Sequence, residues 1–405
     1  MTSSSRRKRK KLLRILKNKR VLLGITGGVA AYKSIDLVRR LKDEGASVVV
    51  AMTEAAKQFV TPLSLEVASQ NKVYTSLFDE PMAHISLPAN TDVMVIAPAT
   101  ANTIAKFAHG ITDDLLSTCF LSYRGRVVIA PAMNWRMYEN RIFRENLQRL
   151  LSLGVVQVGP EIGDLACGEE GIGRMAETAE IIEAVQSVLT EKDLSGEKIV
   201  ITAGPTREYL DPVRFISNRS SGKMGFALAK AARNRGAYVT LISGPSSLKG
   251  PGGTAFVQVE TSAEMMEAVK KAVGADTTVL IMAAAVADFS PASTSDTKIE
   301  KTGEMNIRLR PTEDIISTVA AFEKRPFIIG FAAETGDNIS RAEGKMKTKK
   351  MDMIVFNDVT EPGAGFDVDT NRVVIIDKNG KTALELTGKD RVSDAILDRL
   401  LEIKA

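Results

Sequence analysis

The sequence has little cysteine and no long apolar run. Two cysteines among 405 residues, Cys119 and Cys167, cannot form a disulfide framework, which favours a reducing, cytoplasmic compartment. No apolar stretch is long enough to cross a bilayer, so we expect no membrane partner. Acidic residues are absent from the first 20 positions, which hold ten Lys or Arg.

This basic N-terminal extension, residues 1–20, hides the charge of the remaining chain. The net charge is +5, yet the rest of the chain carries 44 basic and 49 acidic side chains. The run Arg6-Arg-Lys-Arg-Lys-Lys11 could contact nucleic acid or an anionic membrane. A solvated extension explains it more simply, and we expect no nucleic-acid partner. It does not resemble a secretory signal, because Arg14 interrupts its short apolar run.

The length and the strand pattern predict two α/β domains. A chain of 405 residues is too long for one core, and a polar linker begins at Glu191, so we expect domains at 21–190 and 191–405. Val21–Gly28 and Lys198–Gly204 are both apolar runs that end in glycine. A buried strand that breaks at glycine and opens a helix is typical of the first unit of a doubly wound sheet, with a flavin or nucleotide at the turn.

Short Val/Ile-rich runs predict parallel strands buried on both faces, and longer amphipathic runs predict helices between them. The predicted strands are Val21–Leu23, Ser47–Met52, Val93–Ala97, Val127–Ala130, Ile199–Thr202, Tyr238–Ile242, Val257–Val259, Val279–Met282, Phe327–Gly330 and Met353–Phe356, with a hairpin of Arg372–Asp377 and Lys381–Leu386. The predicted helices are Ala30–Leu41, Leu115–Leu121, Arg141–Leu151, 176–190, Gly225–Asn234, Ser262–Val273, Asn338–Lys350 and a closing helix. Ser290–Arg310 shows no helix-like or strand-like periodicity of apolar residues and is predicted to be a functional loop.

Neither glycine turn matches a phosphate-binding P-loop. Tyr32 stands where the first turn would need glycine before Lys33, and Met224 follows Lys223 in the second half. Each turn can still offer a helix N-terminus that binds an anion.

Three residues of the first half could carry chemistry, each with a structural alternative. His84 precedes a predicted strand and could act as a general base, although a lone histidine is more often structural. Asn134 follows a buried strand and could bind a carboxylate, or it could cap a helix. Cys167 lies among glycines and acids, where a thiol can donate a proton, whereas Cys119 resembles ordinary core.

The second half offers donor-rich and charged segments. Residues 211–225 place small and donor-rich side chains before a helix, which suits a phosphorylated substrate. Asp288 follows a buried strand and could hold Mg²⁺ or a nucleotide, or cap a helix. Lys298 and Lys301 could neutralise developing phosphate charge. Lys345 and Lys349 share a helix face, which on charge alone is a solvated one.

Together these segments resemble the bifunctional coenzyme A biosynthesis family, phosphopantothenoylcysteine decarboxylase/phosphopantothenate–cysteine ligase. The resemblance covers residues 20–400 and depends on the order and spacing of several motifs rather than on any one. They are Gly24-Ile-Thr-Gly-Gly28, His84-Ile-Ser, Pro131-Ala-Met-Asn134-x-x-Met137, Ala166-Cys-Gly-x-x-Gly-x-Gly-Arg-Met-Ala-Glu177, Ile201-Thr-Ala-Gly-Pro-Thr-Arg207, Ser217-Asn-Arg-Ser-Ser-Gly222 and Ala283–Asp288.

For the first half the resemblance implies a flavodoxin-like, Rossmann-type domain of the homo-oligomeric flavin-containing Cys decarboxylases. FMN would oxidise the thiol of 4′-phosphopantothenoylcysteine, which then loses CO₂. His84 would be the base, Asn134 would hold the substrate carboxylate, and Cys167 would donate a proton from a clamp loop. The residues implied to contact FMN are Gly27, Gly28, Thr53, Pro98, Ala99, Thr100, Ala101 and Asn102.

For the second half the resemblance implies a Rossmann-like ligase domain. CTP would activate the carboxylate of 4′-phosphopantothenate, and the amine of cysteine would displace CMP. Asn218 would bind the acyl intermediate, Lys298 would support acyl transfer and Asp288 would hold Mg²⁺. The residues implied to contact CTP are Met282, Ala283, Ala284, Asp288, Lys298, Glu313, Asp314, Ile315, Ile316, Phe331, Lys345 and Lys349. The family also implies a homo-oligomer built on trimers, up to a dodecamer.

Two other classes of protein remain open from the sequence. One is a related flavin-dependent Cys decarboxylase or flavin prenyltransferase with an inactive C-terminal nucleotide-binding domain, against which Asn134 and Cys167 argue. The other is a protein without enzymatic activity that senses nucleotides or binds nucleic acid through the basic extension.

Overall fold

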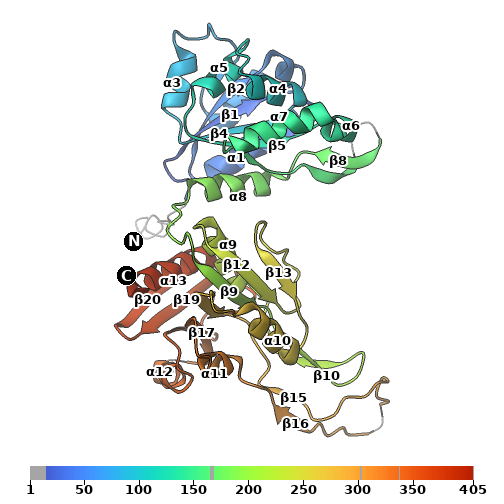
Figure 1. Cartoon of the computed structure of the whole chain (residues 1–405), viewed down its shortest axis with the longest axis vertical. Helices are drawn as coiled ribbons and strands as arrows, with labels where there is room; N and C mark the ends of the chain where they lie inside the picture. The colour runs from blue at the N-terminus through green and yellow to red at the C-terminus, as the bar shows by residue number, and fades with distance from the viewer. Residues whose placement is uncertain (1–14, 165–167, 302, 337, 405) are drawn as a thin grey trace, which may run out of the picture. The chain divides into compact units, whose positions relative to one another are not determined.

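The computed structural model describes residues 15–164, 168–301, 303–336 and 338–404, which form two compact units, Met1–Thr190 and Glu191–Ala405. Each unit contains a wholly or mostly parallel β-sheet with helices on both faces (Figure 1). Most of the basic extension lies outside the described residues. Its end belongs to the fold, because Leu16 is buried in the first core and Arg20 begins the first strand, one residue earlier than the domain start predicted at residue 21.

The first unit has a six-stranded parallel sheet in the order β3-β2-β1-β4-β5-β6. This is the Rossmann-type order, whereas flavodoxin itself has the order 2-1-3-4-5. The strands are β1 Arg20–Ile25, β2 Ser47–Met52, β3 Val73–Tyr74, β4 Val93–Ala99, β5 Arg126–Pro131 and β6 Val156–Gln157, and β7 Glu161–Asp164 and β8 Glu170–Arg174 form a separate antiparallel hairpin.

Helices cover both faces of this sheet. One core lies between the sheet and α1, α2 and α8, and the other lies between the sheet and α4, α5 and α7. The helices are α1 Ser34–Asp43, α2 Pro62–Ser69, α3 Ala83–Ala89, α4 Ala101–His109, α5 Leu115–Ser122, α6 Trp135–Glu139, α7 Arg141–Ser152 and α8 Thr178–Leu189, with the 3-10 helices η1 Val29–Lys33 and η2 Glu54–Gln58. The predicted helix Ala30–Leu41 is therefore two elements, because its first turn is tightened into η1.

The second unit has an eight-stranded sheet in the order β13-β12-β9-β14-β17-β18-β19-β20. All neighbours are parallel except β18–β19 and β19–β20. The strands of this sheet are β9 Lys198–Ala203, β12 Tyr238–Ser243, β13 Ala255–Gln258, β14 Val279–Met282, β17 Phe327–Glu334, β18 Met353–Asp358, β19 Thr370–Asp377 and β20 Gly380–Gly388. The predicted strand Val257–Val259 corresponds to β13, which begins two residues earlier and ends one residue earlier.

The helices α9 Lys223–Asn234 and α13 Lys389–Lys404 pack on one face of this sheet. The helices α10 Ser262–Ala272, α11 Ile315–Ala320 and α12 Ile339–Thr348 pack on the other face. The predicted loop Ser290–Arg310 has a short strand at each end, because β15 Phe289–Pro291 pairs with β16 Leu309–Pro311.

The second glycine turn does not open a helix directly, and the predicted helix Gly225–Asn234 is α9, which begins two residues earlier at Lys223. Gly204 has φ +73, and the chain then forms β10 Arg207–Tyr209 and β11 Phe215–Ser217 before α9 begins. The residue that precedes α9 is Gly222, with φ +80, and a Cβ there would lie 3.2 Å from the nitrogen of Gly204. Two glycines in left-handed conformations therefore bring the two turns together.

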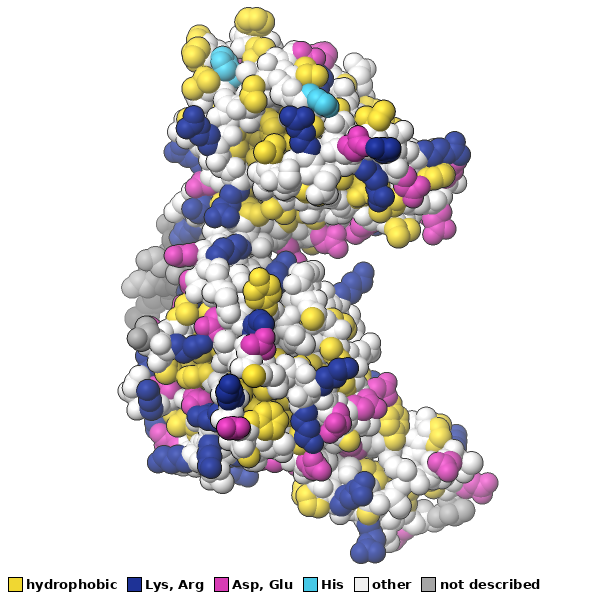
Figure 2. Space-filling view, in the orientation of Figure 1, with side chains coloured by type: hydrophobic (Ala, Val, Ile, Leu, Met, Phe, Trp, Pro, Cys, Tyr) yellow, Lys and Arg dark blue, Asp and Glu magenta, His cyan; other side chains and the backbone are white. Residues whose placement is uncertain are grey.

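The first unit exposes large apolar side chains on and near α2 and α3. Figure 2 shows apolar side chains gathered at the end of this unit that carries α3 in Figure 1. Phe78 is 92% exposed. The other exposed large apolar residues on or near these two helices are Phe59, Leu63, Val67, Met82 and Ile85. No helix in the described part of the chain is both long enough and apolar enough to span a membrane.

Candidate active sites

The first unit encloses a cavity of about 1140 Å³ beside the ends of β1 and β4. The order of the strands reverses between β1 and β4, which is where ligands bind in doubly wound sheets. The cavity is lined by six of the eight residues that the sequence assigned to FMN: Gly27, Gly28, Thr53, Thr100, Ala101 and Asn102.

The other two residues, Pro98 and Ala99, are not among the lining residues and lie within β4. The carbonyl oxygen of Pro98 accepts a hydrogen bond from the hydroxyl of Thr26 at 2.8 Å. The same hydroxyl accepts a hydrogen bond from the backbone N–H of Thr100 at 3.0 Å. The segment 98–100 therefore holds the first glycine turn against the end of β4.

The glycine turn is closely packed, and the neighbouring Thr53 has a buried hydroxyl that can bind a polar ligand. A Cβ at Gly27 would lie 2.4 Å from the Cβ of Ala55, so no side chain is accommodated there. The hydroxyl oxygen of Thr53 is buried, lines the cavity and has no hydrogen-bond partner among the described residues. Since buried polar atoms are normally paired, this oxygen fits a ligand that supplies the partner.

Asn134 has both roles that the sequence left open. Its side-chain oxygen caps α6 by accepting from the backbone N–H of Arg136 at 2.9 Å, and the residue lines the cavity. Its amide nitrogen donates to Glu169 at 3.4 Å. The cap fixes the orientation of the amide at the cavity wall.

The β7–β8 hairpin is tied to α6 by Glu169. This carboxylate accepts hydrogen bonds from the indole N–H of Trp135 at 2.8 Å and from Arg136 at 2.7 Å. Cys167 belongs to the segment between the two strands and lies outside the described residues. The described part of the hairpin carries Asp164 and Arg174 to the cavity.

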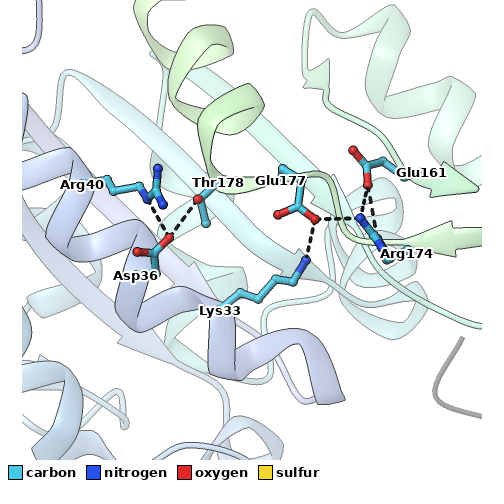
Figure 3. Close-up of polar contacts among 7 residues, drawn as sticks. All are labelled: Lys33, Asp36, Arg40, Glu161, Arg174, Glu177 and Thr178. Atoms are coloured by element: carbon cyan, nitrogen blue, oxygen red, sulfur yellow. Dashed lines mark hydrogen bonds and ion pairs between the residues drawn. The ribbon is translucent and has the colours of Figure 1, made fainter. Parts of the chain in front are cut away.

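A chain of ion pairs joins this hairpin to the helix that follows the glycine turn (Figure 3). Glu177 accepts from Lys33 at 3.1 Å and from Arg174 at 2.8 Å, and Arg174 also pairs with Glu161 at 2.9 Å. Lys33 and Arg174 line the cavity. The hydrogen bond from Lys33 holds the pKa of Glu177 below its ordinary value. This network was not predicted, because its members are 144 residues apart in sequence at the widest.

His84 is not brought to the cavity of its own chain. It is the second residue of α3, is half-buried and is absent from the lining residues. His109 is the last residue of α4, and its Nε2 lies 2.9 Å from the side-chain oxygen of Asn146. Cys119 is fully buried, and burial raises the pKa of its thiol to about 12, so its prediction as a core residue is confirmed.

The second unit encloses a cavity of about 610 Å³ at the carboxyl ends of β14, β17 and β18. It is lined by Asn218 and by eleven of the twelve residues that the sequence assigned to CTP: Met282, Ala283, Ala284, Asp288, Glu313, Asp314, Ile315, Ile316, Phe331, Lys345 and Lys349. The amide of Asn218 donates to the carbonyl oxygens of Ala285 at 3.3 Å and Val286 at 2.9 Å. Asn218 therefore fixes the backbone that leads to Asp288.

Lys345 of α12 and Lys349, the residue after the helix, line this cavity and are paired with carboxylates. Lys345 lies 2.6 Å from Glu334, and Lys349 lies 2.9 Å from Asp314. Burial alone would raise the pKa of Asp314, but Lys349 and Ser317 together hold it below its ordinary value. These lysines are thus cavity residues rather than members of a solvated face.

Lys298 is exposed and is not among the residues that line the cavity. The next residue is anchored elsewhere, because the backbone N–H of Ile299 donates to Asp211 at 3.1 Å and its carbonyl accepts from Arg214 at 2.9 Å. The described residues contain no group of three or more His, Cys, Asp or Glu side chains that could hold a metal ion. Asp288 is therefore not part of a preformed metal cluster in the described chain.

Comparison with known proteins identifies the family. A flavoprotein family model matches residues 9–190, and the model of the DNA/pantothenate metabolism flavoprotein C-terminal domain matches residues 194–403. The coenzyme A biosynthesis bifunctional protein CoaBC of Vibrio cholerae is 45% identical over 395 residues, 96% of this chain and 99% of that protein. The Bacillus subtilis protein of the same name is 44% identical over 396 residues, with 96% and 98% covered.

The chain belongs to the family of coenzyme A biosynthesis bifunctional proteins.

Two solved structures are similar to single halves of this family member. The C-terminal domain of a coenzyme A biosynthesis bifunctional protein CoaBC is 39% identical and covers 53% of this chain and 98% of its own, with a TM-score of 0.45. The FMN binding protein AtHal3 is 33% identical and covers 42% of this chain and 96% of its own, with a TM-score of 0.37. A decarboxylase or prenyltransferase with an unrelated or inactive second half is not favoured, since the bifunctional relatives match along both halves.

Some cavity residues of this family member were missed from the sequence. They are Lys33 and Arg174 in the first cavity and Asn357, Asn371 and Lys389 in the second. Asn357 carries a usable signal, because it is a polar residue at the carboxyl end of a buried parallel strand. Lys389 has no such signal in the sequence, because its position at the cavity depends on where β20 ends.

Proposed function

We propose that this chain performs two consecutive steps of coenzyme A biosynthesis in two separate cavities. The second unit joins cysteine to 4′-phosphopantothenate with CTP, and the first unit decarboxylates the product, 4′-phosphopantothenoylcysteine, to 4′-phosphopantetheine. The observation that carries the proposal is that each unit has its own cavity at the carboxyl ends of parallel strands of its own sheet, lined by different sets of family motifs.

The first cavity is the proposed FMN site. Bound FMN would supply the two-electron oxidation of the substrate thiol that makes loss of CO₂ possible, and the return of those electrons. Gly27, Gly28 and Asn102 would lie against it, and the unpaired hydroxyl of Thr53 would bind one of its polar groups. Asn134, held by its cap, would bind the substrate carboxylate, and Cys167 would donate the final proton.

The second cavity is the proposed ligase site. The substrate carboxylate would attack the α-phosphorus of CTP and release pyrophosphate, and the amine of cysteine would then displace CMP. Lys345 and Lys349 would exchange their carboxylate partners for phosphate oxygens. Mg²⁺ is bound in many nucleotide sites through one or two carboxylates plus substrate phosphates, and Asp288 can supply one of these. Lys298 would reach the acyl group only if residues 298–301 move toward the cavity.

The active form is proposed to be a homo-oligomer built on trimers. His84, the proposed base, is absent from the cavity of its own chain, and its neighbours in sequence Met82 and Ile85 are exposed apolar residues. Packing these surfaces against a second copy would bury them and bring His84 toward a neighbouring cavity. Light scattering is expected to give a mass that is a multiple of three chains, and a monomer with full decarboxylase activity would contradict this.

The most direct test of the proposed function is the absorption spectrum together with a two-step assay. The purified protein is expected to be yellow with the FMN spectrum and to convert 4′-phosphopantothenate, cysteine and CTP to 4′-phosphopantetheine. A colourless protein that takes up no FMN when it is supplied would rule out the first half of the proposal. A protein without CTP-dependent pyrophosphate release would rule out the second half.

A further inference from the structure

The amide of Asn357 is a buried polar group that the proposed reaction does not yet use. Asn357 lies near the end of β18, lines the second cavity and is 8% exposed. Its side-chain oxygen is buried and has no hydrogen-bond partner among the described residues. Leaving a buried acceptor unpaired is unfavourable, and native proteins rarely do so without a ligand or water to complete it.

Two neighbouring polar side chains of the cavity are already satisfied within the protein. The side-chain oxygen of Asn371 accepts from the backbone N–H of the next residue at 3.0 Å. The ammonium group of Lys389 donates to three carbonyl oxygens of the segment 365–368, at 3.0, 3.2 and 2.6 Å. Lys389 therefore positions that segment as a wall of the cavity, and Asn357 differs from both neighbours in having an acceptor to offer a ligand.

The alternation of β18 shows on which side of the sheet Asn357 lies. Met353 and Val355 belong to the core shared with α9 and α13, whereas Ile354 and Phe356 belong to the core shared with α10 and α11. Successive side chains of a strand point to opposite faces, so Asn357 points to the α9–α13 side. The cavity residues on this side include Gly222 and Lys223 at the start of α9.

The residues assigned to the nucleotide lie largely on the other side. Lys345 lies on α12, Lys349 directly follows this helix, and Ile316 lies on α11; both helices pack on the opposite face of the sheet. Ala283 and Phe331, which are also assigned to the nucleotide, pack on the side of Asn357. The lysines assigned to the phosphates nevertheless lie on the opposite side, which leaves the amide of Asn357 to the second large ligand of the ligase reaction, the acyl substrate. Between its phosphate and its carboxylate, 4′-phosphopantothenate carries a secondary amide N–H and a hydroxyl, both of which can donate a hydrogen bond.

We propose that the side-chain oxygen of Asn357 accepts a hydrogen bond from the amide N–H or the hydroxyl of the pantothenate arm, and that it thereby selects the acyl substrate. This inference rests on the proposed ligase function and deepens it. A site built to pair with a substrate N–H or O–H discriminates strongly against analogues that lack it, because the protein group is then left unpaired.

The test is a kinetic comparison of the wild-type protein with Asn357→Leu, which keeps the shape of the side chain and removes its hydrogen bonding. Ligase activity is measured as CTP-dependent pyrophosphate release in the full chain. The KM for 4′-phosphopantothenate is expected to rise at least about tenfold, while the KM values for CTP and cysteine change less than about twofold. The thermal midpoint of the ligand-free variant is expected to equal or exceed that of the wild type, since no internal hydrogen bond is lost.

Asn371→Leu is the matched control, because it removes a buried asparagine that has an internal partner. This variant is expected to lower the thermal midpoint of the ligand-free protein. Two results would overturn the inference: an unchanged KM for 4′-phosphopantothenate in Asn357→Leu, or a fall in its thermal midpoint as large as that of the control. An increased KM for CTP instead would also overturn it by assigning Asn357 to the nucleotide.

Substrate analogues keep the inference testable even if Asn357→Leu does not fold. One analogue has an N-methyl amide and the other lacks the hydroxyl, and both are assayed with the wild-type protein. One of the two is expected to show a KM increase of at least about tenfold, and wild-type activity on both at the normal KM would contradict the inference. Absence of any CTP-dependent reaction with the normal substrate would instead refute the proposed function itself.

Discussion

Thr53 and Asn357 show what distinguishes the cavities at the scale of single residues. Each has a buried side-chain oxygen without a partner among the described residues, and each lines a cavity of its own unit. A third buried side-chain oxygen without a partner among the described residues, that of Asn234, lines neither cavity. Thr26, by contrast, is paired with the backbone at positions 98 and 100. Unpaired acceptors at a cavity wall are thus a more specific sign of a binding site than the glycines, which also serve packing.

The burial of Cys119 leads to a prediction about thiol reactivity. Because its thiol is fully buried with a pKa raised to about 12, Cys119 is expected to be unreactive toward Ellman's reagent in the native protein. The Cys167→Ser variant leaves Cys119 as the sole cysteine. Native Cys167→Ser protein should therefore show no reactive thiol, and one thiol per chain after unfolding. Rapid reaction of the native variant near neutral pH would contradict the assigned burial.

At the scale of elements, Glu169 fastens the β7–β8 hairpin to α6 beside Asn134. Glu169→Ala removes these charge-assisted hydrogen bonds and should lower the decarboxylation rate about tenfold, since the hairpin is held less firmly at the cavity. Ligase activity should be unchanged. The fluorescence of Trp135, the single tryptophan, reports the local change, because its indole N–H donates to Glu169.

Glu170→Ala is the control for this experiment, since Glu170 is the exposed neighbouring residue on β8. It should leave both activities and the tryptophan fluorescence near the wild-type values. Equal losses of decarboxylase activity in the two variants would show that the contacts of Glu169 with α6 do not matter for the reaction.

The pairing of Glu177 with Lys33 and Arg174 predicts a pH dependence of stability for the first unit (Figure 3). The pKa of Glu177 is lowered in the folded state, chiefly by Lys33, so its contribution is present above its ordinary pKa of 4.5 and is lost as the pH falls below that value. Because Glu177 is half-exposed, we expect Glu177→Gln to cost about 1 kcal/mol or less at pH 7.

Urea unfolding followed by the fluorescence of Trp135 measures this difference in the free energy of unfolding. The difference between the wild type and Glu177→Gln should stay constant from pH 7 to about pH 5 and shrink as the pH falls through 4.5. A difference that grows on acidification would have the wrong sign for this pairing.

Elements that depend on local patterns were predicted well, and elements that depend on distant contacts were not. The strand Val279–Met282 has the same bounds in the structure, because it is a run of large apolar residues that two threonines precede and three alanines follow. The β10–β11 segment between Gly204 and Gly222 was not predicted. The backbone β-bridge between Pro205 and Ala285 that supports this segment joins residues 80 apart in sequence. Residues 290–310 lack periodicity, so the pairing of β15 with β16 left no signal in the sequence.

The candidate site residues were likewise predicted where they depend on local sequence patterns. Residues 282–284 lie at the end of strand β14, and residues 313–316 lie at the start of helix α11. Their position at the cavity follows from the order of strands and helices. Lys298 lies on an exposed segment anchored to Asp211 and Arg214, and only the structure shows that it is outside the cavity. The roles proposed for His84, Asn134 and Cys167 stay predictions that activity measurements must decide.

At the scale of the whole molecule, the chain consists of two units with separate cores and separate cavities. Each sheet has its own switch point, so neither cavity needs a strand from the other unit. The account therefore predicts that the two reactions can be separated by a single substitution, although they are consecutive steps carried out by one polypeptide.

Cys167→Ser tests this central claim most directly, with both reactions followed in the same sample. CTP-dependent pyrophosphate release should continue at the wild-type rate, CO₂ should be released about once per chain, and 4′-phosphopantetheine should not accumulate. The flavin absorbance should remain bleached, because the last proton transfer is blocked after decarboxylation. Loss of pyrophosphate release in this variant, or undiminished formation of 4′-phosphopantetheine, would contradict the account.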